Sequence, residues 1–327
     1  MQLPADPHMQ QHPIYDELPR RRLGHTDIDV SIISFGTSPL GNVFRQTDPS
    51  EGIAAVHYAI DRGINFFDVS PYYGITVAET QLGKALSGRR DRVILATKCG
   101  RYGDDVFDFS ATTITAGLED SLKRLQTDYV DLLQAHDVEF GDADQIVEET
   151  IPALRKLQEQ GKARYIGITG YSLKNLVEIA SKASIDTILT YCRYNLMITD
   201  IDAKLIPFAK EHGVGIVNAS ALHMGVLTKR GAPSWHPAPP AIKETGQKIV
   251  ELCAEKGVDA AKLALKFCLD HPSVASTLVG MSTREHVEAN LQALKFEIDP
   301  MLLAQINQIV DPVRDYIWSS GNPDNYG

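Results

Sequence analysis

Short apolar runs alternate with longer amphipathic runs from residue 32 onward. Runs rich in β-branched residues predict buried strands, and apolar residues at helical spacing, as over 50–61 and 151–160, predict the helices between them. Glycines that end the amphipathic runs, such as Gly63 and Gly161, fit helix C-termini. Eight strands are predicted at 32–35, 64–67, 92–96, 129–134, 164–168, 186–190, 214–218 and 276–279.

Strands that alternate with helices are typical of a parallel sheet. Eight such units over about 265 residues fit a closed (β/α)8 barrel, a TIM barrel, better than an open doubly wound sheet. Residues 20–30 predict an N-terminal β-hairpin around Gly24 that closes the bottom of the barrel. Two longer irregular segments are expected at 220–240 and 311–327.

The length of 327 residues would suit two average domains, but α/β barrels of this size form one domain. We therefore expect a single barrel domain over 19–327. Residues 1–18 are polar, contain prolines and histidines, and lack the apolar centre of a signal peptide. They are expected to form a disordered lead-in.

Charge and cysteine content narrow the classes of partner and compartment. The net charge of −10 argues against nucleic acids and anionic membranes as partners. The four cysteines are scattered, without a C-x-x-C pair, which favours reduced thiols in a cytoplasmic protein. We expect no membrane span, since the chain has no run of 18 apolar residues. The oligomeric state is left open between monomer and homo-oligomer.

Polar side chains follow several predicted strands at the end where a barrel carries its active site. Asp68 and then Tyr73 follow the second strand, Lys98 ends the third, and His136 follows the fourth. A free tyrosine has a pKa near 10, and a neighbouring ammonium is expected to lower it. A carboxylate would keep that lysine charged, and a histidine would orient a reacting oxygen. Each residue alone is better explained by packing, capping or ion pairing, but four on consecutive strand ends predict a proton-transfer site.

The stretches 67–74, 96–98 and 134–137 resemble the Asp-Tyr-Lys-His tetrad of the aldo-keto reductases, and the similarity runs from about Arg21 to Ile309. Segments 96–102, 136–141, 190–194 and 234–238 resemble the L-galactose dehydrogenase branch of that family. The branch implies oxidation of a sugar at its anomeric carbon with NAD⁺ to give a lactone. The resemblance further implies that Tyr73 is the acid/base, Lys98 tunes its pKa, Asp68 holds the lysine and His136 orients the reacting oxygen.

The chain has no G-x-G-x-x-G after the first strand, so a Rossmann fingerprint does not hold the cofactor. The resemblance instead places the nicotinamide and its ribose near Gly36, Thr37, Asp68, Thr169, Gly170 and Tyr191. Gly170 stands where relatives commonly have an asparagine and lacks its amide side chain, and Tyr191 stands where a glutamine is common. Ser220, Leu222 and Gly225 match the loop over the pyrophosphate.

The adenosine end is expected at the helix that follows Gly280. Ser282 and Glu285 have capping-box spacing, so plain capping explains them equally well. The functional interpretation adds that the N-terminus of this helix can bind an anion. The candidate contacts to the adenosine end of the cofactor are Ser282, Arg284, His286 and Asn290. Gly280 and His286 stand where NADP-using relatives often carry a lysine and an arginine. We therefore expect NAD, with NADP possible through Arg284.

The candidate substrate contacts are Tyr73, His136, Trp235 and His236. Tyr316 or Trp318 of the tail could cover the sugar, and loop packing explains this tail pair equally well.

Two alternatives to a sugar dehydrogenase remain. One is a general aldehyde and ketone reductase that uses NADPH, and the other is a regulatory barrel subunit without turnover. The sequence offers no His-x-His or H-E-x-x-H cluster, so no metal is expected.

Overall fold

The computed structural model describes residues 18–43 and 46–326. The predicted lead-in therefore lies outside the described residues, except for Leu18, whose side chain packs in the main core. Eight parallel strands close into a barrel in the order β10-β3-β4-β5-β6-β7-β8-β9. The predicted (β/α)8 barrel is confirmed. Its strands are β3 (Ile33–Gly36), β4 (Phe66–Asp68), β5 (Ile94–Cys99), β6 (Val130–Ala135), β7 (Ala163–Gly170), β8 (Thr187–Tyr191), β9 (Gly215–Ala219) and β10 (Ser276–Gly280).

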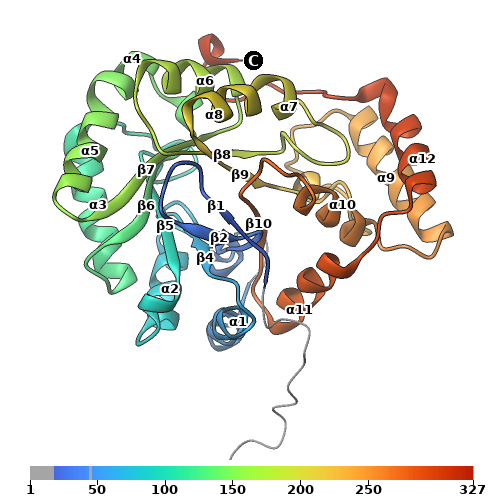
Figure 1. The fold of residues 1–327 in the computed structure, drawn as a ribbon, viewed down its shortest axis with the longest axis horizontal. Coiled ribbons are helices and arrows are strands. Elements are labelled where there is room, and N and C mark those ends of the chain that lie inside the picture. Colours follow the sequence, from blue (N-terminus) through green and yellow to red (C-terminus); the bar gives the residue numbers. More distant parts are fainter. Residues whose placement is uncertain (1–17, 44–45, 327) are drawn as a thin grey trace, which may run out of the picture.

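The helices lie around the outside of the strands (Figure 1). They are α1 (Pro49–Asp61), α2 (Val77–Leu86), α3 (Ala111–Leu125), α4 (Ala143–Gln145), α5 (Ile151–Glu159), α6 (Leu173–Lys182), α7 (Ile201–Lys204), α8 (Ile206–His212), α9 (Pro240–Glu255), α10 (Ala260–Leu269), α11 (Arg284–Gln292) and α12 (Pro300–Val310). A π-helical turn, Ile146–Thr150, joins α4 to α5. Within the described ranges, no helix combines the length and the apolar character needed to cross a bilayer.

Helix α1 shows how the local sequence sets these elements. Asp48 begins it, because its carboxylate accepts hydrogen bonds from the backbone N–H groups of Ser50 and Glu51. Val56 and Ile60 lie one turn apart on the buried face, as the apolar spacing predicts. The helix thus covers the strands while its opposite face stays exposed.

The predicted N-terminal hairpin is present as β1 (Arg20–Arg22) paired with β2 (Asp29–Ser31). Leu23, Ile28 and Val30 from this hairpin pack with Phe66 and Leu132 of the barrel strands. The backbone N–H of His25 donates to the carbonyl of Gly213, just before β9 begins. The hairpin therefore closes the N-terminal end of the barrel, which leaves the C-terminal ends of the strands for a site.

Candidate active site

Barrel closure brings the four tetrad residues together. Asp68 ends β4, Lys98 lies in β5, His136 follows β6, and Tyr73 lies in the turn after β4. The Nζ of Lys98 donates to a carboxylate oxygen of Asp68, to the carbonyl of Val69 at 2.9 Å and to the phenol oxygen of Tyr73 at 3.3 Å. The lysine is thus enclosed by three oxygen acceptors, of which one belongs to the predicted acid/base.

The pKa of Tyr73 lies above its ordinary value, whereas the sequence analysis expected a neighbouring ammonium to lower it. Burial raises the pKa of Tyr73 to about 12, and the nearby charge of Lys98 lowers it only in part. Although burial lowers the pKa of Lys98, the charge of Asp68 raises it above its ordinary value. The ammonium therefore acts in the predicted direction, but desolvation of the phenolate is the larger effect.

His136 is held as a neutral ring. Burial lowers its pKa to about 3, although the charge of Asp137 opposes this. The hydroxyl of Ser70 accepts the backbone N–H of Tyr72 and lies 3.0 Å from Nδ1 of His136. That hydroxyl can therefore give its hydrogen to Nδ1, which leaves the ring hydrogen on Nε2. The ring meets Tyr73 edge-on, with centroids 5.8 Å apart.

Two supporting residues were missed by the sequence analysis. Ser70 orients His136, and the amide of Gln134 donates to the second carboxylate oxygen of Asp68 at 3.0 Å. Gln134 lies two positions before His136, and period-two spacing along a strand could have placed both on the same side. Ser70 lies in a turn, where no periodicity predicts the direction of a side chain.

The predicted nicotinamide residues lie on neighbouring strand ends. Thr37 donates its hydroxyl to the carbonyl of Asp68 at 2.8 Å, and Gly36 pairs with Asp68 between β3 and β4. Thr169 accepts the backbone N–H of Asp137 at 3.0 Å, and Gly170 and Tyr191 end β7 and β8.

Glu139 explains why Gly170 lacks an asparagine side chain. A Cβ atom on Gly170 would overlap the Oε2 atom of Glu139. Burial, followed by the charge of Asp137, raises the pKa of Glu139 to about 8. Its Oε1 accepts the backbone N–H of Tyr171 at 2.9 Å and lies 3.5 Å from the hydroxyl of Tyr191. The space that an asparagine would fill therefore holds a glutamate from the adjacent β6 loop.

The loop after β9 carries the residues predicted for the pyrophosphate. Ser220 and Gly225 both have positive φ, 63° and 100°, and Leu222 precedes the short 3₁₀ turn His223–Gly225. Positive φ at the non-glycine Ser220 is uncommon and marks a tightly turned backbone.

At the predicted adenosine end, Thr283 rather than Ser282 caps α11, so the predicted capping box is wrong. Thr283 has extended dihedral angles, and its hydroxyl accepts the backbone N–H of His286. Ser282 lies one residue earlier, and its buried hydroxyl has no hydrogen-bond partner. A cavity of about 410 Å³ adjoins it, lined by Gln46, Thr47, Glu51, Ser282, Thr283, Glu285 and His286.

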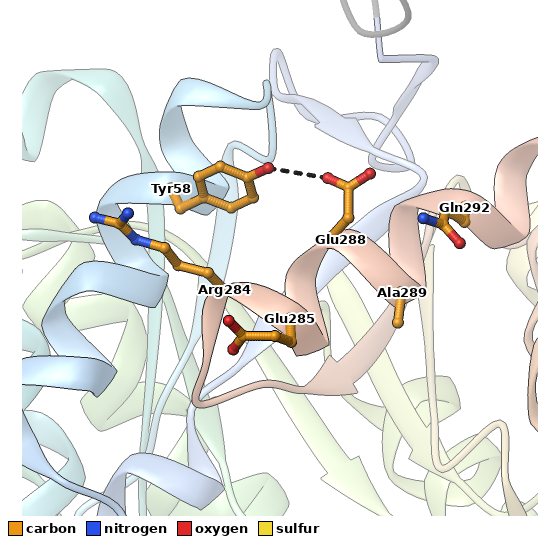
Figure 2. Close-up of a pocket in the computed structure, with 6 residues that line it drawn as sticks. All are labelled: Tyr58, Arg284, Glu285, Glu288, Ala289 and Gln292. Atoms are coloured by element: carbon orange, nitrogen blue, oxygen red, sulfur yellow. Dashed lines mark hydrogen bonds between the residues drawn. The ribbon is translucent and has the colours of Figure 1, made fainter. Parts of the chain in front are cut away.

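Arg284 lies elsewhere. It lines a neighbouring cavity of about 380 Å³ together with Tyr58, Glu288 and Gln292 (Figure 2). The hydroxyl of Tyr58 donates to Glu288 across this cavity at 3.0 Å. Gly280 ends β10 beside Pro39, and Asn290 lies half-buried on α11. Of the predicted adenosine residues, Ser282 and His286 thus line one cavity and Arg284 lines the other.

The predicted substrate residues of the loop after β9 differ from each other in exposure. Trp235 is 56% exposed and His236 only 3%. Both ring nitrogens of His236 have backbone partners, the carbonyl of His223 and the N–H of Ala238. Trp318 of the tail stacks on Tyr171, with centroids 4.6 Å apart.

Comparisons with known proteins agree with the fold of this chain. The sequence profile of the aldo/keto reductase family matches residues 32–311. The chain is 45% identical to an L-galactose dehydrogenase of Arabidopsis thaliana over 92% of this chain and 97% of the relative. It is 30% identical to a D-arabinose 1-dehydrogenase of Saccharomyces cerevisiae over 85% and 90%. The holo form of an aldo-keto reductase from Bacillus halodurans superposes with a TM-score of 0.78 and 29% identity, covering 93% of this chain and 99% of that one.

Proposed function

The chain belongs to the aldo/keto reductase family, and we propose that it oxidises an aldose at its anomeric carbon to the lactone, with L-galactose as the first candidate. It is an NAD(P)-dependent oxidoreductase. The observation that carries the proposal is the 3.3 Å contact between Lys98 and the Tyr73 phenol beside a neutral His136. The sugar identity is supported by the 45% identical L-galactose dehydrogenase.

In this proposal Tyr73 takes the proton of the anomeric hydroxyl, and His136 donates its Nε2 hydrogen to the same oxygen. The charge of Lys98 stabilises the phenolate, and Asp68 keeps Lys98 charged and in place. As the O–H bond breaks, the C1–H bond gives up its electron pair as hydride and the C1=O bond of the lactone forms. The oxidised nicotinamide, when bound, is the hydride acceptor.

The residues present fit such a cofactor. Ser282 offers a buried hydroxyl without a partner at the N-terminus of the nine-residue helix α11, where backbone N–H groups favour an anion. We propose that Ser220, Leu222 and Gly225 cover the pyrophosphate. Thr37, Thr169 and their strand-end neighbours would lie by the nicotinamide.

We propose NAD rather than NADP as the preferred cofactor. Among the described residues, which do not include 44–45, the cavity beside Ser282 is lined by the carboxylates of Glu51 and Glu285 and by no lysine or arginine. A 2′-phosphate needs charged donors and would meet these carboxylates. Arg284, the one candidate cation that we expected there, lines the neighbouring cavity instead (Figure 2).

A spectrophotometric panel tests the proposed function. NADH or NADPH formation at 340 nm is followed with L-galactose, L-fucose, D-arabinose and simple alcohols, each with NAD⁺ and NADP⁺, and the product is identified. NADPH consumption is followed at the same wavelength with simple aldehydes. We expect L-galactose with NAD⁺ to give the highest kcat/KM and a lactone. Tyr73→Phe serves as the matched control. Brisk NADPH-dependent reduction of aldehydes without oxidation of any aldose would instead establish a general carbonyl reductase.

A further inference from the structure

A buried carboxylate lies directly beside the point where the reacting oxygen would bind. Asp137 follows His136, and its Oδ2 lies 3.7 Å from the Nε2 of that ring. The backbone of Asp137 has a φ of 53°, a left-handed conformation that costs free energy and is concentrated at functional sites. This turn of the chain lets two consecutive residues face the same region.

Arg101 completes the arrangement from the loop after β5. Its NH1 donates to Oδ2 of Asp137 at 2.5 Å, and its Nε donates to the carbonyl of Gly103. The guanidinium lies 3.8 Å from the ring centroid of Tyr72 and 5.1 Å from that of Phe107. The guanidinium therefore packs over aromatic rings at the side of the site.

The pair has acceptor and donor capacity beyond its mutual bond. A carboxylate offers about four acceptor positions and a guanidinium five N–H donors. A hydroxyl both donates and accepts, so it can bind such a pair at both of its atoms. A carboxylate ligand would be repelled by Asp137 and an ammonium by Arg101. The chemistry therefore fits a neutral hydroxyl group next to the reacting carbon.

We propose that Asp137 and Arg101 recognise the hydroxyl on the carbon adjacent to the oxidised one, the C2 hydroxyl of an aldose. Asp137 accepts the hydrogen of that hydroxyl, and Arg101 donates to its oxygen. The position follows from the geometry, because the C2 oxygen neighbours the C1 oxygen that Tyr73 and His136 bind. This inference rests on the proposed function and assigns it two specificity-determining residues.

The test compares a variant and wild type on two sugars, one with and one without the C2 hydroxyl. Asp137→Asn and wild type are compared on L-galactose and on 2-deoxy-L-galactose. We expect the variant to lose about 10- to 100-fold in kcat/KM with L-galactose, the range for a hydrogen bond to a charged group. With the deoxy sugar its kcat/KM should stay within about threefold of wild type. An equal loss on both sugars, or no loss on either, overturns the proposal.

Two further measurements separate recognition from a structural role. NADH binding, followed by fluorescence, should be unchanged in Asp137→Asn. Arg101→Lys keeps the charge but loses the planar fork, and it should show the same loss confined to L-galactose; this variant decides the matter if Asp137→Asn does not fold. Asp105→Asn, in the same loop and exposed, is the matched control and should change neither sugar.

Failure of the proposed function is distinguishable from failure of this inference. If wild type oxidises no aldose, the same comparison is run on NAD(P)H-dependent reduction of glyceraldehyde and propanal. Glyceraldehyde carries a hydroxyl next to the reacting carbon and propanal does not. A loss in Asp137→Asn confined to glyceraldehyde supports the pair, and an equal loss on both aldehydes overturns it.

Discussion

Glu139 and Gly170 share one space at the end of the barrel, because Oε2 of Glu139 occupies the place that a side chain at position 170 would need. The carboxylate comes from the β6 loop and the glycine from the end of β7. Residue 170 is therefore small because its neighbour is large.

Gly170→Asn is expected to destabilise the protein by about 1–3 kcal/mol, the usual cost of overpacking. Thermal or chemical unfolding measures the loss. The double variant Glu139→Ala/Gly170→Asn should recover part of it, because the overlap is removed. Additive losses in the double variant would show that the two side chains do not compete.

Glu139→Gln should change how stability depends on pH. Burial raises the pKa of Glu139 from an ordinary 4.5 to about 8. Between these values the unfolded chain has lost the proton and the folded chain keeps it, so wild-type stability falls as pH rises through this window. The variant should not show this pH-dependent loss of stability. The difference between its Tm and that of wild type should therefore shift in favour of the variant as the pH rises from 5 to 8. The exposed Glu148→Gln is the control, and a pH-independent difference would contradict the prediction.

Tyr73→Phe removes the ionisable group and keeps the ring. We expect kcat to fall by at least about 10²-fold, the usual scale for loss of a general acid or base, with NADH affinity nearly unchanged. Steady-state kinetics and fluorescence titration measure the two quantities. Near-normal turnover would remove Tyr73 from its proposed role.

Oxidation by wild type should rise with pH, because the base form of Tyr73 becomes more populated toward its pKa of about 12. Lys98→Met removes the charge that lowers this pKa, so it should abolish most turnover and shift the remaining activity to higher pH. The pH profiles of kcat/KM for the two proteins make the comparison. A surviving profile that does not move to higher pH would refute the role given to Lys98.

Glu51→Gln should narrow the proposed preference for NADH over NADPH. Glu51 is exposed beside the cavity at Ser282, so removing its charge should tighten NADPH binding by only about two- to fivefold. Fluorescence titration with both cofactors gives the ratio. Glu288→Gln removes the same charge from the neighbouring cavity and should leave the ratio unchanged; an equal effect of both variants would mean that only the overall charge matters.

The sequence by itself determined the strand positions and the tetrad. Alternation of apolar and amphipathic runs depends on local burial, and each strand prediction overlaps its observed strand, as 129–134 overlaps Val130–Ala135. Parallel strands in a closed barrel end on the same side, so Asp68, Lys98 and His136 could be expected together before any distance was known.

Only the tertiary structure decided what those residues do to one another. Whether Lys98 or burial controls the pKa of Tyr73 depends on how much water the closed barrel excludes, and burial prevails. Arg284 and Ser282 are two positions apart in sequence, but the start of α11 directs them to different cavities. Asp137 and Arg101, 36 positions apart, meet because β5 and β6 are neighbours in the sheet. Local pattern carries no information on such contacts, since the direction of a side chain at a strand end is set by the loops that pack around it.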